Sequence, residues 1–150
     1  MTETDPLEPM LKLAKASAKS DHEYFQSLAA EVNMPEVKLL LIVLAESESK
    51  MLDKIQHMML TGIVDELEEL DSIRNRDAVP DSSPIKPERI DTDPRIFVCN
   101  KVLEKSIKTY TLYLRLATRA KSELVSRLFE YLAHLKMRQV SELRRMCESY

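Results

Sequence analysis

The chain has 150 residues, a formal net charge of −3 and one glycine. This length suits a single domain with a sizeable core. Phosphate-cradling loops and dinucleotide-binding turns need several glycines, so Gly62 alone excludes both kinds of site. The longest apolar run, 37–45, contains a lysine and is far shorter than the ~20 residues of a membrane helix, so we expect a soluble protein and no membrane partner.

The first half of the chain predicts two long helices. Asp5 and Pro6 provide a capping side chain and a proline suited to the first helical turn. Apolar residues then recur at spacings of three, four and seven, which predicts a helix over about 7–32. After a short break, a second helix is predicted over 35–61, and Gly62 ends it.

A connection follows, which we place at 61–92. Its first part, 63–73, predicts a short acidic amphipathic helix, and the rest is rich in Pro, Ser and Asp, which is typical of an irregular strap. A connection of this length can cross from one end of a helical bundle to the other.

The second half repeats the pattern of the first. Asp93 and Pro94 form another capping pair, and a third helix is predicted to run to about Ala120. Ser122 is the predicted N-cap of a fourth helix that ends near Cys147.

Residues 5–60 and 93–148 match without gaps at an offset of 88 residues. Identical residues at this offset include Val37 and Val125, Leu40 and Leu128, Leu44 and Leu132, Ala45 and Ala133, and Met58 and Met146. A repeat at a fixed period indicates two copies of one structural unit. The fold we predict is therefore an all-α four-helix bundle, one domain over 1–150, made of two related helical hairpins joined by a long crossover.

The residues of each repeat resemble a known pattern, Y-x3-LA followed by LxxLAxxExxH. The matching segments are 24–29 with 41–51 in the first repeat and 113–117 with 128–139 in the second. The pattern resembles the ferritin-like superfamily, in particular its rubrerythrin-type bundles. The resemblance implies two metal ions at the bundle centre, held by one Glu from each of two helices and a Glu-x-x-His pair from each of the other two.

The residues at the implied ligand positions do not suit a di-metal centre. The six positions fall on Ala18, Glu48, Met51, Ser106, Lys136 and Gln139. Only Glu48 is of the ligand type, and an ammonium group at the position of Lys136 would repel a cation. We therefore expect a degenerate metal site, no metal and no cofactor.

Glu48 and Lys136 are equivalent under the repeat, so both are expected to point into the bundle centre. We predict a buried ion pair between them, supported by Gln139, Ser106 and a hydroxyl of Tyr110 or Tyr113. In the alternative, Lys136 extends to the surface and Glu48 binds water.

Charge is distributed unevenly along the chain. Residues 1–93 contain 10 Lys and Arg against 20 Asp and Glu, whereas residues 94–150 contain 12 against 5. One interpretation is that an acidic hairpin packs against a basic one with charges paired across the seam. The other is a basic face that binds an acidic protein or another polyanion, formed by Arg115, Arg119, Lys121, Arg127, Arg138, Arg144 and Arg145.

The two cysteines, Cys99 and Cys147, lack the spacing of a disulfide framework or of a thiolate zinc site. We expect both to be reduced thiols. This expectation, together with an acidic N-terminus that does not resemble a signal peptide, favours a cytoplasmic location.

Two functional hypotheses follow. The first is a non-catalytic ferritin-like protein that serves as a structural or interaction module, with a homodimer supported by an apolar patch at Met58, Met59 and Leu60. The alternative is a rubrerythrin-like metal-binding oxidoreductase or metal-storage protein that uses Glu48 with unidentified ligands. No catalytic residue is assigned, and a small apolar or anionic ligand near Lys136 stays open as a further alternative.

Overall fold

The computed structural model describes residues 7–73 and 79–150, and every regular element in these ranges is helical. The elements are α1 Leu7–Glu31, α2 Pro35–Thr61, α3 Val64–Ser72, the 3-10 turn η1 Pro87–Arg89, α4 Pro94–Arg119 and α5 Glu123–Glu148. The expectation of an all-α protein is confirmed. No helix of the described ranges combines the length and the apolar character needed to span a bilayer.

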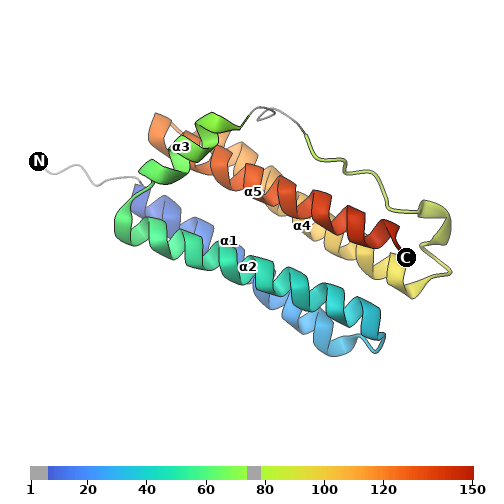
Figure 1. Cartoon of the computed structure of the whole chain (residues 1–150). Coiled ribbons are helices and arrows are strands. Elements are labelled where there is room, and N and C mark those ends of the chain that lie inside the picture. Colours follow the sequence, from blue (N-terminus) through green and yellow to red (C-terminus); the bar gives the residue numbers. More distant parts are fainter. Residues whose placement is uncertain (1–6, 74–78) are drawn as a thin grey trace, which may run out of the picture.

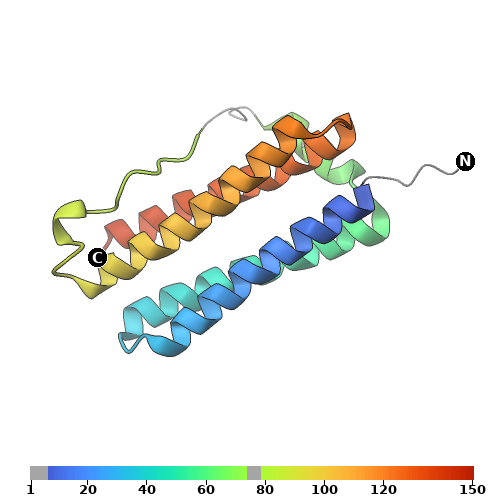
Figure 2. The same cartoon turned by 180° about the vertical axis from the view of Figure 1, so that it is seen from behind.

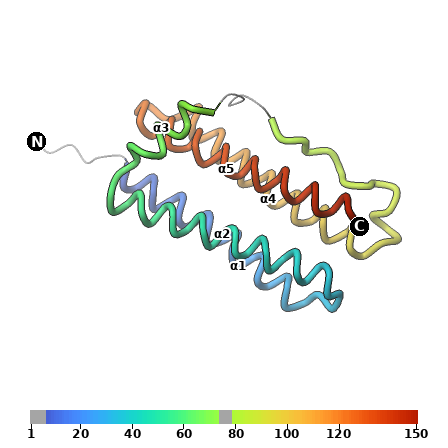
Figure 3. The backbone as a smooth tube through the Cα atoms, in the orientation of Figure 1, coloured from blue at the N-terminus to red at the C-terminus, as the bar shows by residue number. Residues whose placement is uncertain are grey.

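The four long helices form two antiparallel hairpins. Helices α1 and α2 pack closely against each other, as do α4 and α5, while direct contact between the hairpins is sparser. The hairpins lie side by side, with α3 against α5 at one end (Figures 1 and 2). The backbone trace shows residues 79–92 running along the second hairpin, and the C-terminus of α5 lies at the end opposite to α3 (Figure 3).

Local signals in the sequence account for the helix ends. The Asp93 carboxylate accepts a hydrogen bond from the Arg95 backbone N–H at 3.0 Å, and the Ser122 hydroxyl accepts one from Val125 N–H at 3.3 Å. Both N-caps are therefore confirmed. The cap predicted at Asp5 and Pro6 lies outside the described residues, as does part of the predicted strap, 74–78.

Gly62 ends α2 with a backbone conformation that requires glycine. Its φ is 86° and its ψ is −174°, and its N–H donates to the Met58 carbonyl at 2.9 Å. A side chain is strained at this φ and ψ. The chain can therefore turn sharply from α2 into α3 at this residue.

The internal repeat is visible in the helix bounds. Adding 88 to the bounds of α1 gives 95–119, and adding 88 to those of α2 gives 123–149. Each value lies within one residue of the bounds of α4 and α5. The sequence repeat thus corresponds to two hairpins with matched helix lengths.

The core consists of two apolar clusters at opposite ends of the bundle. One includes Leu11, Ile55, Leu70 and Tyr131 beneath α3, and the other includes residues near the far end, such as Leu41. On each long helix, the buried residues change from one cluster to the other about halfway along. Buried polar side chains occupy this middle level, and the candidate functional site therefore lies there.

The C-terminal part of the crossover is held against the second hairpin by polar contacts. The Asn100 side chain accepts a hydrogen bond from Ile85 N–H at 2.8 Å and donates to the Ile85 carbonyl at 3.0 Å. Arg144 donates to the Ser83 carbonyl at 2.6 Å. These contacts satisfy backbone groups of an irregular segment, so that the segment can cover apolar side chains of the hairpin.

Candidate functional site

At the middle level of the bundle, four buried polar side chains, one from each long helix, are joined by hydrogen bonds and ion pairs. They are Asp21 on α1, Glu48 on α2, Thr109 on α4 and Lys136 on α5, and their exposed fractions are 1%, 1%, 6% and 1%. We call these four residues the polar layer. Burying three charged groups is costly unless they are paired, so their mutual geometry decides what the layer can do.

Lys136 lies at the centre of the polar layer. Its Nζ donates to Asp21 Oδ2 at 2.8 Å and also to the Glu48 carboxylate. The ring centroid of Phe25 lies 5.9 Å from the same nitrogen, within the range of a cation–π contact. A single ammonium group therefore bridges carboxylates from both helices of the other hairpin.

Two further groups reach Asp21 from α4. The Thr109 hydroxyl donates to its carboxylate, at 2.8 Å from Oδ2, and Lys105 Nζ lies 3.7 Å from Oδ1. The Lys105 side chain is 31% exposed, so it closes the layer from the solvent side. The polar layer is thus hydrogen-bonded throughout, as buried charges require.

The polar layer follows the internal repeat. Asp21 and Thr109 are 88 residues apart, and so are Glu48 and Lys136. In each pair the first repeat contributes a carboxylate acceptor and the second contributes a donor. The two copies have diverged at these positions into complementary halves of one site.

Burial and charge shift the ionisation of groups at this level. The pKa of Glu48 is raised, chiefly because burial disfavours the carboxylate, although Lys136 opposes this and Asp21 adds to it. Burial is also the main reason that the pKa of the Tyr113 phenol is raised, and the charges of Glu48 and Asp21 raise it further. Burial thus opposes ionisation of Glu48, and the contact with the Lys136 ammonium favours it.

The structure contains the ion pair expected between Glu48 and Lys136. With an exposed fraction of 1%, Lys136 does not extend to the surface, so that alternative is wrong. The supporting residues also differ from those expected. Gln139 donates to Ser47 Oγ at 3.0 Å, and the contacts to the pair come instead from Asp21, which is joined to Thr109.

The other implied ligand positions carry side chains without metal-binding character. Ala18 on α1, Met51 on α2 and Ser106 on α4 are buried, and Gln139 on α5 is half-buried. Ala18 and Met51 belong to the apolar cluster beneath α3. These positions line the bundle interior at and beside the polar layer, as the repeat predicts.

Asp21 and Thr109 were missed from the sequence, although a signal was present. Asp21 lies one helical turn beyond Ala18, and the 88-residue offset pairs it with Thr109. An isolated Asp in a helix with many charged residues does not stand out. Comparing the polar positions of both repeats, rather than the family pattern alone, would have found the pair.

The donor set of the polar layer does not fit a di-metal centre. Its two carboxylates are already bound to the Lys136 ammonium, and no imidazole stands at the ligand positions. Among the described residues, no group of three or more His, Cys, Asp or Glu side chains is arranged to hold a metal ion.

The uneven charge distribution of the sequence corresponds to ion pairs at the seam between the two hairpins. In the ranges that the structure describes, the ion pairs that join the hairpins are Arg95 with Glu36, Lys105 with Asp21, and Lys136 with Asp21 and Glu48. In each pair the second hairpin supplies the cation and the first supplies the anion. The first interpretation of the charge pattern accounts for these contacts.

The predicted basic face divides into paired and unpaired residues. Three arginines pair within the chain: Arg127 with Asp71, Arg144 with Asp81 and Arg145 with Glu142. Four exposed cations form no ion pair within the described ranges, namely Arg115, Arg119, Lys121 and Arg138. The first three of these lie close together in sequence, in the last turns of α4 and just after it, whereas Arg138 lies in α5.

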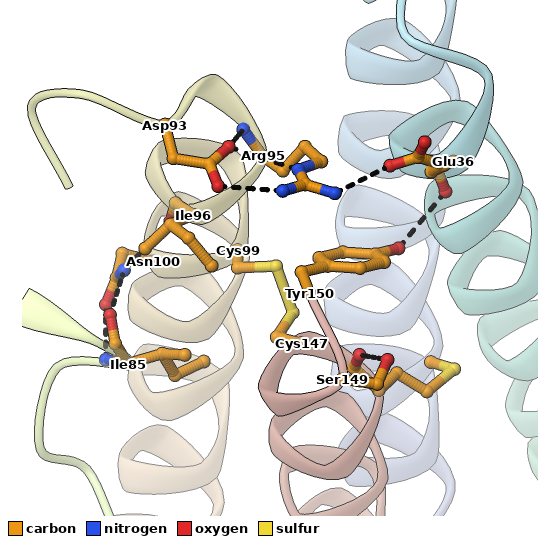
Figure 4. The surroundings of a disulfide bond; sticks show 11 residues. Glu36, Ile85, Asp93, Arg95, Ile96, Cys99, Asn100, Cys147, Ser149 and Tyr150 are labelled. Carbon is orange, nitrogen blue, oxygen red and sulfur yellow. Dashed lines mark hydrogen bonds and ion pairs between the residues drawn. A yellow bond between two sulfur atoms is a disulfide. The ribbon is translucent and has the colours of Figure 1, made fainter. Parts of the chain in front are cut away.

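Cys99 and Cys147 form a disulfide, so the prediction of two reduced thiols is wrong. Their Cα atoms are 6.2 Å apart, and both residues are fully buried (Figure 4). The short-range spacing rules used for cysteines do not detect this pair. It forms because an antiparallel hairpin brings the start of α4 to the level of the end of α5. The disulfide also removes the argument from reduced thiols for a cytoplasmic location.

Polar contacts surround the disulfide and join it to the first hairpin. Arg95 binds Asp93 at 3.0 Å and Glu36 at 3.1 Å, and its guanidinium lies 5.4 Å from the ring centroid of Tyr150. The Tyr150 hydroxyl donates to the Glu36 carbonyl at 3.2 Å (Figure 4). The end of α5 is thus tied both to α4 and to the start of α2.

Comparisons with protein-family models, with curated proteins and with solved structures found no match.

Proposed function

We propose that this protein is a non-catalytic, ferritin-like four-helix bundle whose centre is closed by ion pairs rather than by metal, and that it acts as a structural or interaction module. The observation that carries the proposal is the position of Lys136. Its ammonium group binds the two buried carboxylates at the level where the resemblance implies metal ions. A cation that is covalently part of the chain supplies the charge that those carboxylates need.

The alternative is a metal-binding oxidoreductase or metal-storage protein that uses Glu48. For this function Lys136 would have to leave the carboxylates and move to a surface from which it is now excluded. A metal ion would then meet two carboxylates, Asp21 and Glu48, without the imidazoles that set the geometry of such sites. The ion-paired centre requires no such rearrangement.

The test is the metal content of the purified chain. The protein is expressed with iron and manganese supplied, washed with a chelator and analysed for metal per chain, with the helical spectrum recorded in parallel. We expect less than about 0.1 metal ion per chain together with an intact helical spectrum, since a specific di-metal site would retain close to two. Retention of one or two iron or manganese ions per chain would reject the proposal and restore the oxidoreductase.

The partner proposed for the interaction module is an acidic protein or another polyanion. Support comes from three exposed cations that form no ion pair within the described residues, Arg115 and Arg119 in the last turns of α4 and Lys121 just after it. Retention on a heparin column measures binding to a polyanion directly. We expect retention to fall strongly when Arg115, Arg119 and Lys121 are all replaced by glutamine, but not when Lys12, Lys38 and Lys108 on other surfaces are replaced instead. An equal loss of heparin retention in both triple variants would mean that retention depends only on the net charge of the protein.

A homodimer is the oligomer proposed. Of the three residues expected to form its apolar patch, Met58 is buried and Met59 is half-buried, which leaves Leu60 at 76% exposed. Val64 at the start of α3 is also an exposed apolar residue, at 67%. Sedimentation equilibrium should show a dimer that dissociates when Leu60 and Val64 are replaced by lysine. A wild-type protein that sediments as a monomer would exclude the proposed homodimer.

A further inference from the structure

A groove of about 350 Å³ lies at the seam between α2 and α5, on the outer side of the polar layer. Its polar lining consists of Ser47, Lys50, Lys54, Arg138, Gln139 and Glu142. Met51 and Leu135 add apolar surface. Both hairpins contribute to the groove, and its volume falls within the range of small-molecule sites.

The lining of the groove carries excess positive charge in a protein of net charge −3. Three cations face one anion, Glu142, which is itself paired with Arg145. Lys54 lies 3.5 Å from Glu69, whose carboxylate also interacts electrostatically with Arg138. Lys50 and Arg138 are exposed, and neither forms an ion pair within the described part of the chain. These two cations come from α2 and α5, the two helices that line the groove.

The neutral polar side chains of the groove add further donors. Gln139 uses one amide hydrogen to bond Ser47 Oγ at 3.0 Å, which leaves the second amide hydrogen and the Ser47 hydroxyl hydrogen available. A guanidinium offers a planar pair of donors that fits the oxygens of a phosphate, and a lysine adds a point charge. The lining is therefore rich in donors and poor in acceptors.

We propose that this groove is a binding site for a small organic phosphate, with the phosphate group between Lys50 and Arg138 and the carbon part of the ligand on Met51 and Leu135. With Lys54 paired to Glu69 and Glu142 paired to Arg145, the two remaining cations of the lining, Lys50 and Arg138, match a phosphomonoester dianion better than a monoanionic carboxylate. Such a ligand would join α2 to α5, where the hairpins make few direct contacts. Its binding would therefore stabilise the association of the hairpins.

Phenyl phosphate is a suitable probe because it combines a phosphate dianion with a compact apolar ring. It is titrated into the isotope-labelled full-length chain while the backbone amides, the Gln139 side-chain amide and the Arg138 Nε–H are followed by NMR. We expect saturable shifts at Gln139, Arg138 and residues of α2 near Lys50. Inorganic phosphate should bind the same site more weakly, and benzyl alcohol should not bind.

Matched variants locate the site. Arg138→Gln and Lys50→Gln should each weaken phenyl phosphate binding at least tenfold, while Lys12→Gln on α1 should leave it unchanged. All three side chains are exposed, so the variants are expected to keep the helical spectrum of the wild type, which is checked directly. Rescue of binding by Arg138→Lys to an intermediate level would show the contribution of the planar guanidinium.

Three outcomes would overturn the proposal. The first is an absence of saturable shifts at the groove up to 10 mM probe, on the order of the weakest affinity of interest. The second is equal binding of benzoate and phenyl phosphate, which would show a general carboxylate or anion site. The third is loss of binding in Arg119→Gln but not in Arg138→Gln, which would place the probe at the α4–α5 turn. None of these outcomes depends on the metal content of the bundle centre.

Discussion

At the scale of single residues, the polar layer is the part of the molecule where substitutions are expected to matter most. Lys136 is the one fully buried cation among the described residues, and it neutralises carboxylates from two different helices. Removing one member of a buried ion cluster leaves the others unpaired, whereas removing all of them together can be nearly neutral. This contrast provides a test of the layer.

Replacing Lys136 with methionine keeps most of the side-chain volume and removes the charge. Asp21 and Glu48 then face each other without the ammonium, and we expect the free energy of unfolding to fall by roughly 3–5 kcal/mol. The triple variant Asp21→Asn, Glu48→Gln, Lys136→Met should recover much of this loss. Urea denaturation measures the free energy of unfolding of the single and the triple variant.

Lys108→Met is the matched control for that substitution, because Lys108 is exposed and its ion pair with Glu104 is solvated. We expect it to change the free energy of unfolding by less than about 0.5 kcal/mol. If Lys136→Met were as mild as Lys108→Met, the ammonium would not be buried between the carboxylates in solution.

The raised pKa of Glu48 predicts a particular pH dependence. Above its unfolded pKa of 4.5 and below its folded pKa, the folded chain binds more protons at Glu48 than the unfolded chain does. The contribution of Glu48 to stability is therefore fully present below pH 4.5 and is lost as the pH rises through the folded pKa. In Glu48→Gln this loss is absent, so the free energy of unfolding should rise more steeply with pH, or fall less, than in the wild type.

Urea midpoints measured at intervals from pH 4.5 to neutrality test this difference in slope. Glu46→Gln on the exposed side of α2 is the control for removing one carboxylate from the same helix. A curve for Glu48→Gln that runs parallel to that of the wild type would contradict a raised pKa for Glu48.

At the scale of elements, capping side chains and a glycine determine where helices begin and end. Asp93 and Ser122 cap the helices of the second hairpin, and Gly62 allows the turn between α2 and α3. These signals act over a few residues, so they can be identified without knowledge of the tertiary structure. Each can also be tested by a single substitution.

Gly62→Ala isolates backbone strain from packing. A Cβ atom at this position would meet no other atom within 4 Å, so any destabilisation arises from the φ of 86°. We expect the free energy of unfolding to fall by about 1–3 kcal/mol. Thr61→Ala is the neighbouring control and should stay within about 0.5 kcal/mol of the wild type, since its hydroxyl is exposed. No change in Gly62→Ala would mean that the turn relaxes into another conformation.

At the scale of the whole molecule, contacts between distant segments join the two hairpins and lock their ends. The cations of the second hairpin bind anions of the first at Arg95, Lys105 and Lys136. The disulfide joins residues 48 positions apart and holds the beginning of α4 to the end of α5. The ion pairs therefore hold the two hairpins together, and the disulfide holds together the two helices of the second hairpin.

Reduction of the disulfide should destabilise the chain. A closed loop of this length restricts the unfolded state, so we expect a thiol reductant to lower the free energy of unfolding by about 2–4 kcal/mol. The double variant Cys99→Ala, Cys147→Ala should unfold at the same denaturant concentration with and without reductant. Two alkylatable thiols in the unreduced, denatured wild type would show that the bond does not form.

The sequence alone determined the helical class, the helix bounds to within about two residues and the equivalence of Glu48 and Lys136. These features depend on local capping, on apolar periodicity and on an internal repeat, which are all visible in one dimension. The tertiary structure decided which groups complete the site. Asp21 joins Lys136 because α1 and α5 approach each other across the two hairpins, and Cys99 meets Cys147 because α4 and α5 are antiparallel in one hairpin. No spacing rule within one helix encodes such an approach, which arises from the packing of whole hairpins.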